Sequence, residues 1–439
     1  MPSWLYAVLF ILSILAVVMI HEAGHFFTAR AFGIKVEEFF VGFGPRLWSV
    51  RRGETEYGVK LLPFGGYVRI AGMNPFQEIP ESERPRTFGA KPAWQRAVVI
   101  GTGPVTHFAI VFLLLAGFLM TVGVPAEDRP MVDAVETRIL SVGPSDSGVG
   151  PQPDDLILQV DGRTFAGQGA LVDYLASRSG DEVVLQVARG DARLDVPAVA
   201  SNVQSPAVTA GLQPGDEVVA VDGSPAGTID EVIGYTREHV GETISVTVIR
   251  DGREMTVSAE PALSPIQTAS AVQLVGRFGV GLGGVRERTN PIAAVGRGVV
   301  ETGRITGAVV GQLGDVFGPS GLTRIWRLLT GEESRTSGDV VSVVGAVRLA
   351  SDAGRAGAWI ELFNLLVVLN VFVGIVNFVP LPPLDGGHLA VVVYEVVRRR
   401  KADYRKLAPL SALVAGFLIL FSLSVVYLDI VQPPPSPFR

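Results

Sequence analysis

The residues best suited to carry out chemistry lie at the end of the first apolar stretch. Seventeen apolar or small uncharged residues, Trp4 to Ile20, lead directly into His21-Glu22-Ala23-Gly24-His25. On a helix, two histidines four residues apart project from one face, one turn apart. Two imidazoles at this spacing bind one zinc ion, and a neighbouring glutamate serves as general base. The pattern predicts zinc bound by His21 and His25, with Glu22 as the base.

The setting of this motif strengthens the prediction. The apolar stretch and the motif together reach the roughly 20 residues that span a bilayer core. Ionisable groups at membrane depth are costly, so they usually face the protein interior and carry function. The alternative is a chance match in which the histidines are ordinary core residues. Two histidines that bracket a glutamate in an apolar segment favour a metal site.

Composition narrows the class of protein. The chain has 439 residues, enough for more than one domain, and 48% of them are hydrophobic. The mean hydropathy of +0.38 is typical of a membrane protein with a water-exposed module. The net charge of −6 argues against a nucleic-acid partner. Cysteine is absent, so any metal must be held by histidine, aspartate or glutamate.

Four apolar stretches are long enough to cross a membrane. They cover about residues 3–29, 97–124, 359–380 and 407–431. The first has neither a basic leader nor a cleavage site before the motif, so we interpret it as a retained span rather than a signal peptide.

Charge in the loops predicts the orientation of these spans. The loops 30–96 and 389–406 are rich in arginine and lysine, which the positive-inside rule places in the cytoplasm. Both termini and the segment 125–358 then lie outside, and the metal site lies toward the cytoplasmic side. We therefore expect a multi-pass protein of the cell (inner) membrane.

A third metal ligand is predicted after the third span. The sequence 377–388, Asn-Phe-Val-Pro-Leu-Pro-Pro-Leu-Asp-Gly-Gly-His, breaks the helix with three prolines. Broken helices occur at membrane depth only where the freed backbone is buried in protein or lines a cavity. Asp385 would complete the three protein ligands of a catalytic zinc site, which keeps its fourth position open. Asp385 as a plain turn residue is the alternative, and His388 is a rival ligand.

Two further features lie near the predicted site. Residues 34–72 have the alternation and glycine punctuation of β-hairpins, and such a sheet could add an unwound peptide as a strand. A cytoplasmic cap without substrate contact is the alternative. In the second span, His107 follows Gly101-Thr102-Gly103-Pro104, where glycines allow close helix packing. His107 either hydrogen-bonds into the site or satisfies a neighbouring backbone group.

The outer segment contains an internal repeat. PDDLILQVDG at 153–162 recurs as PGDEVVAVDG at 214–223. We predict one domain over 128–200, a second over 201–262, and a linker over 263–358 that contains an amphipathic helix at the membrane surface. The second domain resembles the PDZ domains of bacterial envelope proteases, and the first resembles them more weakly. Such domains bind peptides by strand addition, although a passive spacer or size filter fits the sequence equally.

The motifs at 21–25 and 377–388 together resemble those of the site-2 protease family of intramembrane zinc metalloproteases. The stretches GFGP, PFGGYV and SVVGA and the paired outer domains resemble the bacterial branch that cleaves anti-sigma factors. The resemblance covers nearly the whole chain. It implies zinc held by His21, His25 and Asp385, with Glu22 catalytic.

The resemblance also implies how substrate is held. Asn377 and the edge strand near Gly65, Gly66, Tyr67 and Val68 would bind the unwound substrate. The family's second-span motif places asparagine where this chain has His107, so a substrate-holding role at that position is not carried over.

The implied protein is a polytopic α-helical membrane protein with four transmembrane helices, a membrane-associated β-hairpin region and an extracytoplasmic tandem of α+β PDZ domains. Residues 1–124 and 359–439 each contribute two transmembrane helices. The implied substrate is a single-span membrane protein of the anti-sigma factor type, already trimmed by another protease, with the PDZ pair excluding untrimmed proteins. A non-proteolytic PDZ scaffold or chaperone in the membrane is the alternative, and it leaves the predicted ligand group unexplained.

Overall fold

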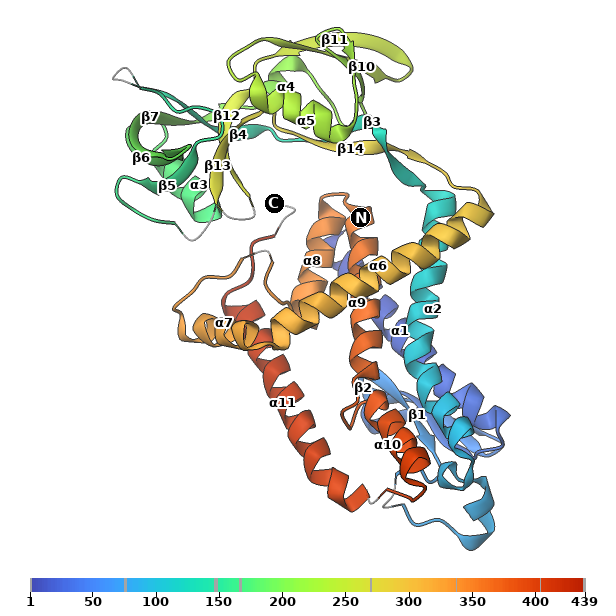
Figure 1. The fold of residues 1–439 in the computed structure, drawn as a ribbon. Helices are drawn as coiled ribbons and strands as arrows, with labels where there is room; N and C mark the ends of the chain where they lie inside the picture. Colours follow the sequence, from blue (N-terminus) through green and yellow to red (C-terminus); the bar gives the residue numbers. More distant parts are fainter. Residues whose placement is uncertain are drawn as a thin grey trace. The chain divides into compact units, whose positions relative to one another are not determined.

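The structure is a computed structural model that describes residues 2–74, 77–145, 149–165, 168–268, 271–336, 338–402 and 404–436. The chain forms two compact units, which Figure 1 shows as ribbons. One unit comprises Met1–Phe118 and Asn290–Arg439, and the other comprises Leu119–Thr289. The predicted metal ligands all belong to the first unit.

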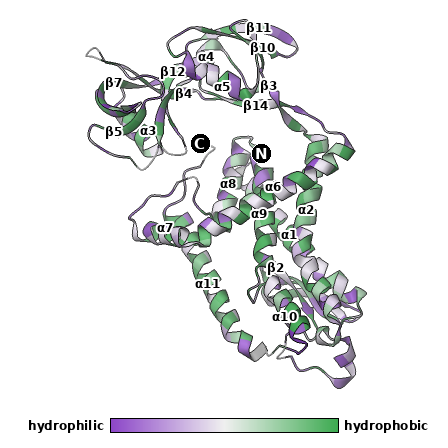
Figure 2. Cartoon of the chain, viewed as in Figure 1, coloured by the Kyte–Doolittle hydropathy of each residue, from purple (hydrophilic) through white to green (hydrophobic). Residues whose placement is uncertain are grey.

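Four helices in the described chain are long and apolar enough to cross a membrane. They are α1 (Ser3–Ala31), α2 (Ala93–Thr121), α9 (Trp359–Phe378) and α11 (Tyr404–Val431). They coincide with the four spans predicted from the sequence, and Figure 2 shows their largely hydrophobic character. Large apolar side chains such as Leu9 and Leu12 lie exposed on α1, as expected of a helix that faces lipid.

Small residues let the helices of the first unit approach closely. A Cβ on Gly24 of α1 would lie 3.0 Å from the Thr106 side chain of α2. A Cβ on Gly374 of α9 would lie 2.9 Å from the Cβ of His107 on α2. Membrane helices pack through small residues in this way because lipid provides no hydrophobic force between them. Helix α2 therefore contacts both α1 and α9 near the motif.

A bent sheet lies after α1. It consists of two long antiparallel strands, β1 (Val36–Arg52) and β2 (Thr55–Ile70). Glycines with positive φ interrupt both strands, Gly42 and Gly44 in β1 and Gly65 in β2. As a result Val41 pairs both with Val59 and with Gly66.

This pairing differs from the separate hairpins that the glycine clusters predicted. The first half of β1 pairs with both halves of β2, because the bends at glycine fold each strand back on the other. Residues 66–70 pair only with 36–41 and so form one margin of the sheet. Two short 3₁₀ helices, Glu81–Arg86 and Phe88–Ala90, follow before α2.

Helix α10 (Asp385–Arg398) is fixed to the start of α2 by a buried ion pair. Arg96 Nη1 lies 2.7 Å from Glu395 Oε2, and both side chains are almost inaccessible. An apolar cluster that includes Phe26 of α1, Val99 of α2 and Val392 of α10 also connects these helices. Breaking a buried ion pair is strongly destabilising, so this contact helps to hold α10 in place.

Three more helices complete the first unit. They are α6 (Pro291–Phe317), α7 (Pro319–Thr330) and α8 (Val343–Arg355). Helix α6 falls where the amphipathic helix was expected. Asp429 near the end of α11 accepts hydrogen bonds from the backbone of Ser342 and Gly345 at the start of α8, and it pairs with buried Arg335.

The second unit contains two sheets, each with its own apolar core. The first has the strand order β12-β13-β5-β6-β7-β4 and carries helix α3 (Gln168–Ser177). Its strands are β4 (Arg138–Pro144), β5 (Leu156–Val160), β6 (Glu182–Arg189), β7 (Ala192–Gln204), β12 (Ala262–Gln267) and β13 (Val272–Arg277).

The second sheet has the order β11-β10-β8-β3-β14, with β9 paired to β8. Helices α4 (Pro206–Ala210) and α5 (Ile229–Glu238) accompany it. Its strands are β3 (Val124–Val135), β8 (Glu217–Val221), β9 (Ser224–Pro225), β10 (Ile244–Arg250), β11 (Arg253–Ala259) and β14 (Val280–Glu287).

The same side-chain contacts recur in the two repeat units. Asp155 and Arg189 form an ion pair at 2.7 Å, and Asp216 and Arg250 form the corresponding pair at 2.6 Å. In each unit a tyrosine also donates a hydrogen bond to the aspartate of the Asp-Gly turn, from Tyr174 to Asp161 and from Tyr235 to Asp222.

The strand pairing differs from the sequential division at residues 200 and 262. Strand β3 lies in the expected first domain but pairs in the second sheet, while β12 and β13 lie in the expected linker and pair in the first. For example, Val272 pairs with Ile157. Local periodicity identifies a strand but does not reveal a distant partner, and sequential strands are neighbours only about two-thirds of the time.

Candidate metal centre

Helix α1 brings His21 and His25 onto one buried face. Their Nε2 atoms lie 3.2 Å apart, and the two residues are 8% and 5% exposed. The Nδ1–H of His25 donates to the backbone oxygen of Val99 on α2 at 2.8 Å. A neutral imidazole that donates from Nδ1 keeps its lone pair at Nε2. The lone pair at His25 Nε2 is therefore directed toward His21 Nε2 and Asp385 Oδ2.

The loop after α9 places the third group. Helix α9 ends at Phe378, and α10 begins at Asp385. Gly386 and Gly387 pack tightly, since a Cβ on Gly386 would lie 2.3 Å from the backbone oxygen of Phe378 and one on Gly387 would lie 2.2 Å from the backbone nitrogen of Pro382. Any larger residue would push α10 away, so the two glycines fix the position of Asp385.

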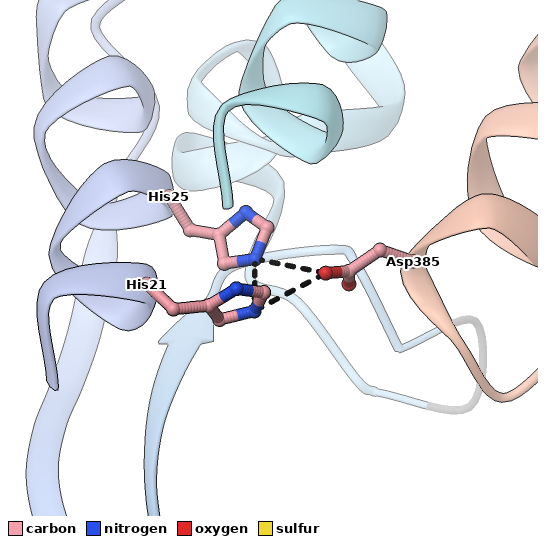
Figure 3. A group of neighbouring side chains, drawn as sticks. All are labelled: His21, His25 and Asp385. Atoms are coloured by element: carbon pink, nitrogen blue, oxygen red, sulfur yellow. Dashed lines mark hydrogen bonds and ion pairs between the residues drawn. The ribbon is translucent and has the colours of Figure 1, made fainter. Parts of the chain in front are cut away.

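Asp385 completes a compact group with the two histidines. Its Oδ2 lies 3.2 Å from His21 Nε2 and 3.3 Å from His25 Nε2, and Figure 3 shows the three side chains converging. Among the described residues, this is a group of three ligand-type side chains whose atoms all lie within 4.8 Å of one another. The predicted ligands from the two motifs are thus brought together.

The group fits a zinc ion. Asp385 Oδ2 is buried and has no hydrogen-bond partner outside this group within the described parts of the chain, and its neighbours are the two imidazole nitrogens. A tetrahedral zinc site with bonds of about 2.0–2.1 Å holds its ligand atoms about 3.3 Å apart. The observed separations of 3.2 and 3.3 Å match that spacing.

Gly103 of α2 borders this group. A Cβ added to Gly103 would lie 2.2 Å from His25 Nε2 and 2.9 Å from His21 Cε1. A separation under 3.0 Å requires one of the groups to move. The space beside the two imidazoles therefore exists only because residue 103 has no side chain.

We expect Gly103→Ala to lower zinc affinity by about 10–100-fold, the range seen when groups around the ligands are disturbed. The matched control is Gly101→Ala in the same helix, where a Cβ would meet nothing within 4 Å. Both changes replace glycine with alanine in one helix, so they alter helix propensity alike. Competition with a chromogenic chelator measures the affinity. Equal affinities in the two variants would show that Gly103 does not shape the site.

Glu22 lies between the histidine pair and the sheet margin. The backbone N–H of Val68 lies near its carboxylate. A Cβ on Gly66 would lie 3.6 Å from Glu22 Cγ and 2.6 Å from the sulfur of Met19, so the strand runs directly against α1. The predicted base and part of the predicted substrate strand are therefore adjacent.

The remaining predicted substrate residues have other surroundings. Gly65 forms the bend that precedes the margin, and the Tyr67 hydroxyl donates to Glu38. Asn377 is half-buried at the end of α9, and its side chain has no hydrogen bond within the described chain. His388, the rival ligand, lies outside the three-residue group. It lines a cavity of about 570 Å³ together with Val68 and neighbouring residues.

His107 belongs to the surroundings of the site. It is 1% exposed, and its Nε2 lies 3.1 Å from His21 Nδ1. Of the two interpretations left open by the sequence, the structure shows the hydrogen bond into the site. Its other ring nitrogen, Nδ1, hydrogen-bonds the side chain of Asn370 on α9. The sequence carried no signal for the contact between His25 and the Val99 carbonyl.

Two imidazoles and a carboxylate on apolar helices, with a glutamate beside them, define a membrane-embedded metal-dependent hydrolase. Comparison with known proteins agrees. The model of Peptidase family M50 matches residues 9–423. Zinc metalloprotease Rip1 of Mycobacterium tuberculosis is 31% identical over 446 residues, with 97% of each chain covered.

Other relatives extend this similarity. Zinc metalloprotease Rip1 of Mycolicibacterium smegmatis is 33% identical over 455 residues, again with 97% of each chain covered. Regulator of sigma-E protease RseP of Escherichia coli is 28% identical over 431 residues, covering 89% of this chain and 90% of the relative. The chain belongs to peptidase family M50, the site-2 protease family, which confirms the resemblance seen in the motifs. It is a zinc metalloprotease, and its cofactor is Zn²⁺.

Proposed function

We propose that this zinc metalloprotease is an intramembrane endopeptidase that cleaves the transmembrane segment of a single-span membrane protein. The main support is the location of the ligand group. His21 and His25 lie within a helix able to cross a membrane, and a six-residue loop connects Asp385 to the end of another, α9. A site at this depth serves substrates that are themselves embedded in the bilayer.

His21, His25 and Asp385 are the proposed zinc ligands. A zinc ion bound there would act as a Lewis acid that lowers the pKa of a water molecule and polarises the scissile carbonyl. Glu22 accepts the proton of the attacking water and passes it to the leaving amine. Glu22 adjoins His21 in the helix, and a Cβ on Gly66 would lie 3.6 Å from its Cγ, so Glu22 lies between the ligands and the sheet margin.

The margin of the sheet is the proposed substrate strand. A helical peptide bond is shielded by backbone pairing, so the substrate must unwind before cleavage. Among the described residues, 66–70 pair with β1 on one side only, and Val68 within this stretch lies near Glu22. A peptide added along this edge would therefore lie next to the base. Asn377, with its unengaged amide, would hold the same peptide.

The orientation proposed from the basic loops also has structural support. The start of α1 and the end of α11 both contact α8, since Tyr6 adjoins Gly354 and Asp429 adjoins Ser342. These contacts with one short helix support placing both ends of the chain's spanning part on one side of the membrane, as an even number of spans requires. We infer that both termini are extracytoplasmic and that the metal centre lies toward the cytoplasm of an inner-membrane protein.

We further infer that the two sheets of the second unit are PDZ-like domains which keep untrimmed proteins from the site. The Escherichia coli relative is named as a regulator of sigma-E protease. A substrate of the anti-sigma factor type, trimmed beforehand by another protease, is the corresponding proposal. The recurring aspartate–arginine and tyrosine–aspartate contacts support two domains of one kind.

The test uses purified full-length protein and a single-span anti-sigma factor, either trimmed or with its whole outer domain. We expect the trimmed form to be cut within its apolar segment, in the half nearer its cytoplasmic flank, and the untrimmed form to resist. Mass spectrometry of the products locates the bond. Cleavage confined to water-exposed parts would refute intramembrane proteolysis, and a cut in the outer half of the span would refute the orientation.

A further inference from the structure

His107 connects a proposed zinc ligand to a buried amide on another helix. His107 Nε2 lies 3.1 Å from His21 Nδ1, and His107 Nδ1 bonds the Oδ1 atom of Asn370. All three side chains are buried, with exposures of 8% for His21, 1% for His107 and 2% for Asn370. Helices α1, α2 and α9 thus contribute one residue each to a continuous hydrogen-bonded chain.

The chemistry of these atoms determines which atom donates in each of the two hydrogen bonds. An amide oxygen only accepts, so the hydrogen between Asn370 and His107 sits on His107 Nδ1. A neutral imidazole protonated at Nδ1 has its lone pair at Nε2, which therefore accepts the Nδ1–H of His21. The lone pair of His21 is then at Nε2, the atom 3.2 Å from Asp385 Oδ2. The two hydrogen bonds together favour the tautomer of His21 that is protonated at Nδ1 and can bind a metal through Nε2.

The opposite direction would block the site. With the amide nitrogen of Asn370 toward His107, every hydrogen in the chain would reverse and His21 Nε2 would carry a proton. In the structure, the Nδ2 atom of Asn370 has no partner among the described residues. Among the described residues, the Asn370 side chain thus makes its hydrogen bond through Oδ1, which accepts from His107 Nδ1.

Packing holds the His107 ring in this position. A Cβ on Gly374 of α9 would lie 2.9 Å from the Cβ of His107, so only a glycine admits α9 this closely. The rings of His21 and His107 lie 5.0 Å apart at 44°. The other ligand, His25, is oriented by a backbone carbonyl instead. Only the orientation of His21 thus depends on a side chain that substitution can remove.

We propose that His107, itself oriented by Asn370, is a positioning residue that fixes the tautomer and the rotation of His21 for metal binding. The proposal rests on the assignment of His21, His25 and Asp385 as zinc ligands. Partners that accept the second ring hydrogen of a ligating histidine typically contribute 10–100-fold to metal affinity. His107 would have this effect without touching the metal or the substrate.

The test compares His107→Gln with His107→Leu in full-length protein purified in detergent. Glutamine places an amide oxygen near the position of Nε2 and can accept the His21 Nδ1–H, whereas leucine fills space without an acceptor. We expect His107→Leu to lower zinc affinity about 10–100-fold and His107→Gln to remain within about threefold of the parent protein. Zinc affinity comes from competition with a chromogenic chelator, and the absorption spectrum of the Co²⁺-loaded protein reports the ligand geometry.

Asn370→Leu supplies a second, independent comparison. This substitution should also lower zinc affinity. The double variant His107→Leu/Asn370→Leu should bind zinc no more weakly than His107→Leu alone, because the effects of residues in one hydrogen-bond network are not additive. Unchanged affinity in His107→Leu, or equal losses in His107→Leu and His107→Gln, would overturn the proposal. Metal affinity decides this question even if no peptide is cleaved, so failure here is distinguishable from failure of the proposed proteolysis.

Discussion

Replacement of Asp385 by alanine is expected to remove zinc from the purified protein. Asp385 supplies the only carboxylate oxygen in the three-residue group of the described chain, and that oxygen lies 3.2 and 3.3 Å from the two imidazole nitrogens. Loss of one of three protein ligands should weaken binding by more than the roughly 10–100-fold typical of an outer-shell partner. Zinc per protein, measured by elemental analysis after dialysis, should fall to background.

His388→Ala is the matched control for this change. His388 lies one turn after Asp385 on α10 and is the rival ligand considered from the sequence, but it stands outside the group. The control should therefore retain its zinc. Retention by Asp385→Ala together with loss in His388→Ala would reverse the assignment of the third ligand.

The arrangement of the site could largely be predicted because its ligands lie in two short sequence motifs. Helical spacing alone places His21 and His25 on one face, and the prolines and glycines around Asp385 require an interruption at membrane depth. The structure brings these residues together, with Glu22 and the sheet margin beside them.

Other features depend on contacts that no local pattern encodes. Whether His107 faces the site depends on how α2 is rotated against α1, and the sequence fixes spacing within a helix but not that rotation. The bent sheet and the exchange of β3, β12 and β13 between sheets depend on distant partners. The Val99 carbonyl that orients His25 is a backbone atom, and any residue type at that position would supply it.

The depth of the site also explains why its ligands need such complete support. At membrane depth a misdirected imidazole has no water to replace its lost hydrogen bond, so each polar atom requires a partner within the protein. His25 donates to Val99 and His21 bonds His107, while Asp385 is held by the packing of Gly386 and Gly387. Among the described residues, the ligand atoms His21 Nε2, His25 Nε2 and Asp385 Oδ2 are directed at one another.

The final prediction separates catalysis from binding. Glu22→Gln keeps the size of the side chain, and its amide oxygen remains a hydrogen-bond acceptor near Val68. The change removes the base but leaves His21, His25 and Asp385 intact. General acid–base assistance contributes roughly 10²–10⁴-fold, so the rate of cleavage should fall at least that far. Zinc content should stay at the level of the parent protein.

The measurement pairs metal per protein with cleavage of a co-expressed, trimmed single-span substrate on a gel. The variant should retain zinc and co-purify with uncut substrate, because neither the ligands nor the strand 66–70 is altered. Full cleavage by Glu22→Gln would remove Glu22 from the mechanism. Loss of zinc in the same variant would instead make the carboxylate a ligand or a structural group, since a residue that serves only the water has no reason to hold the metal.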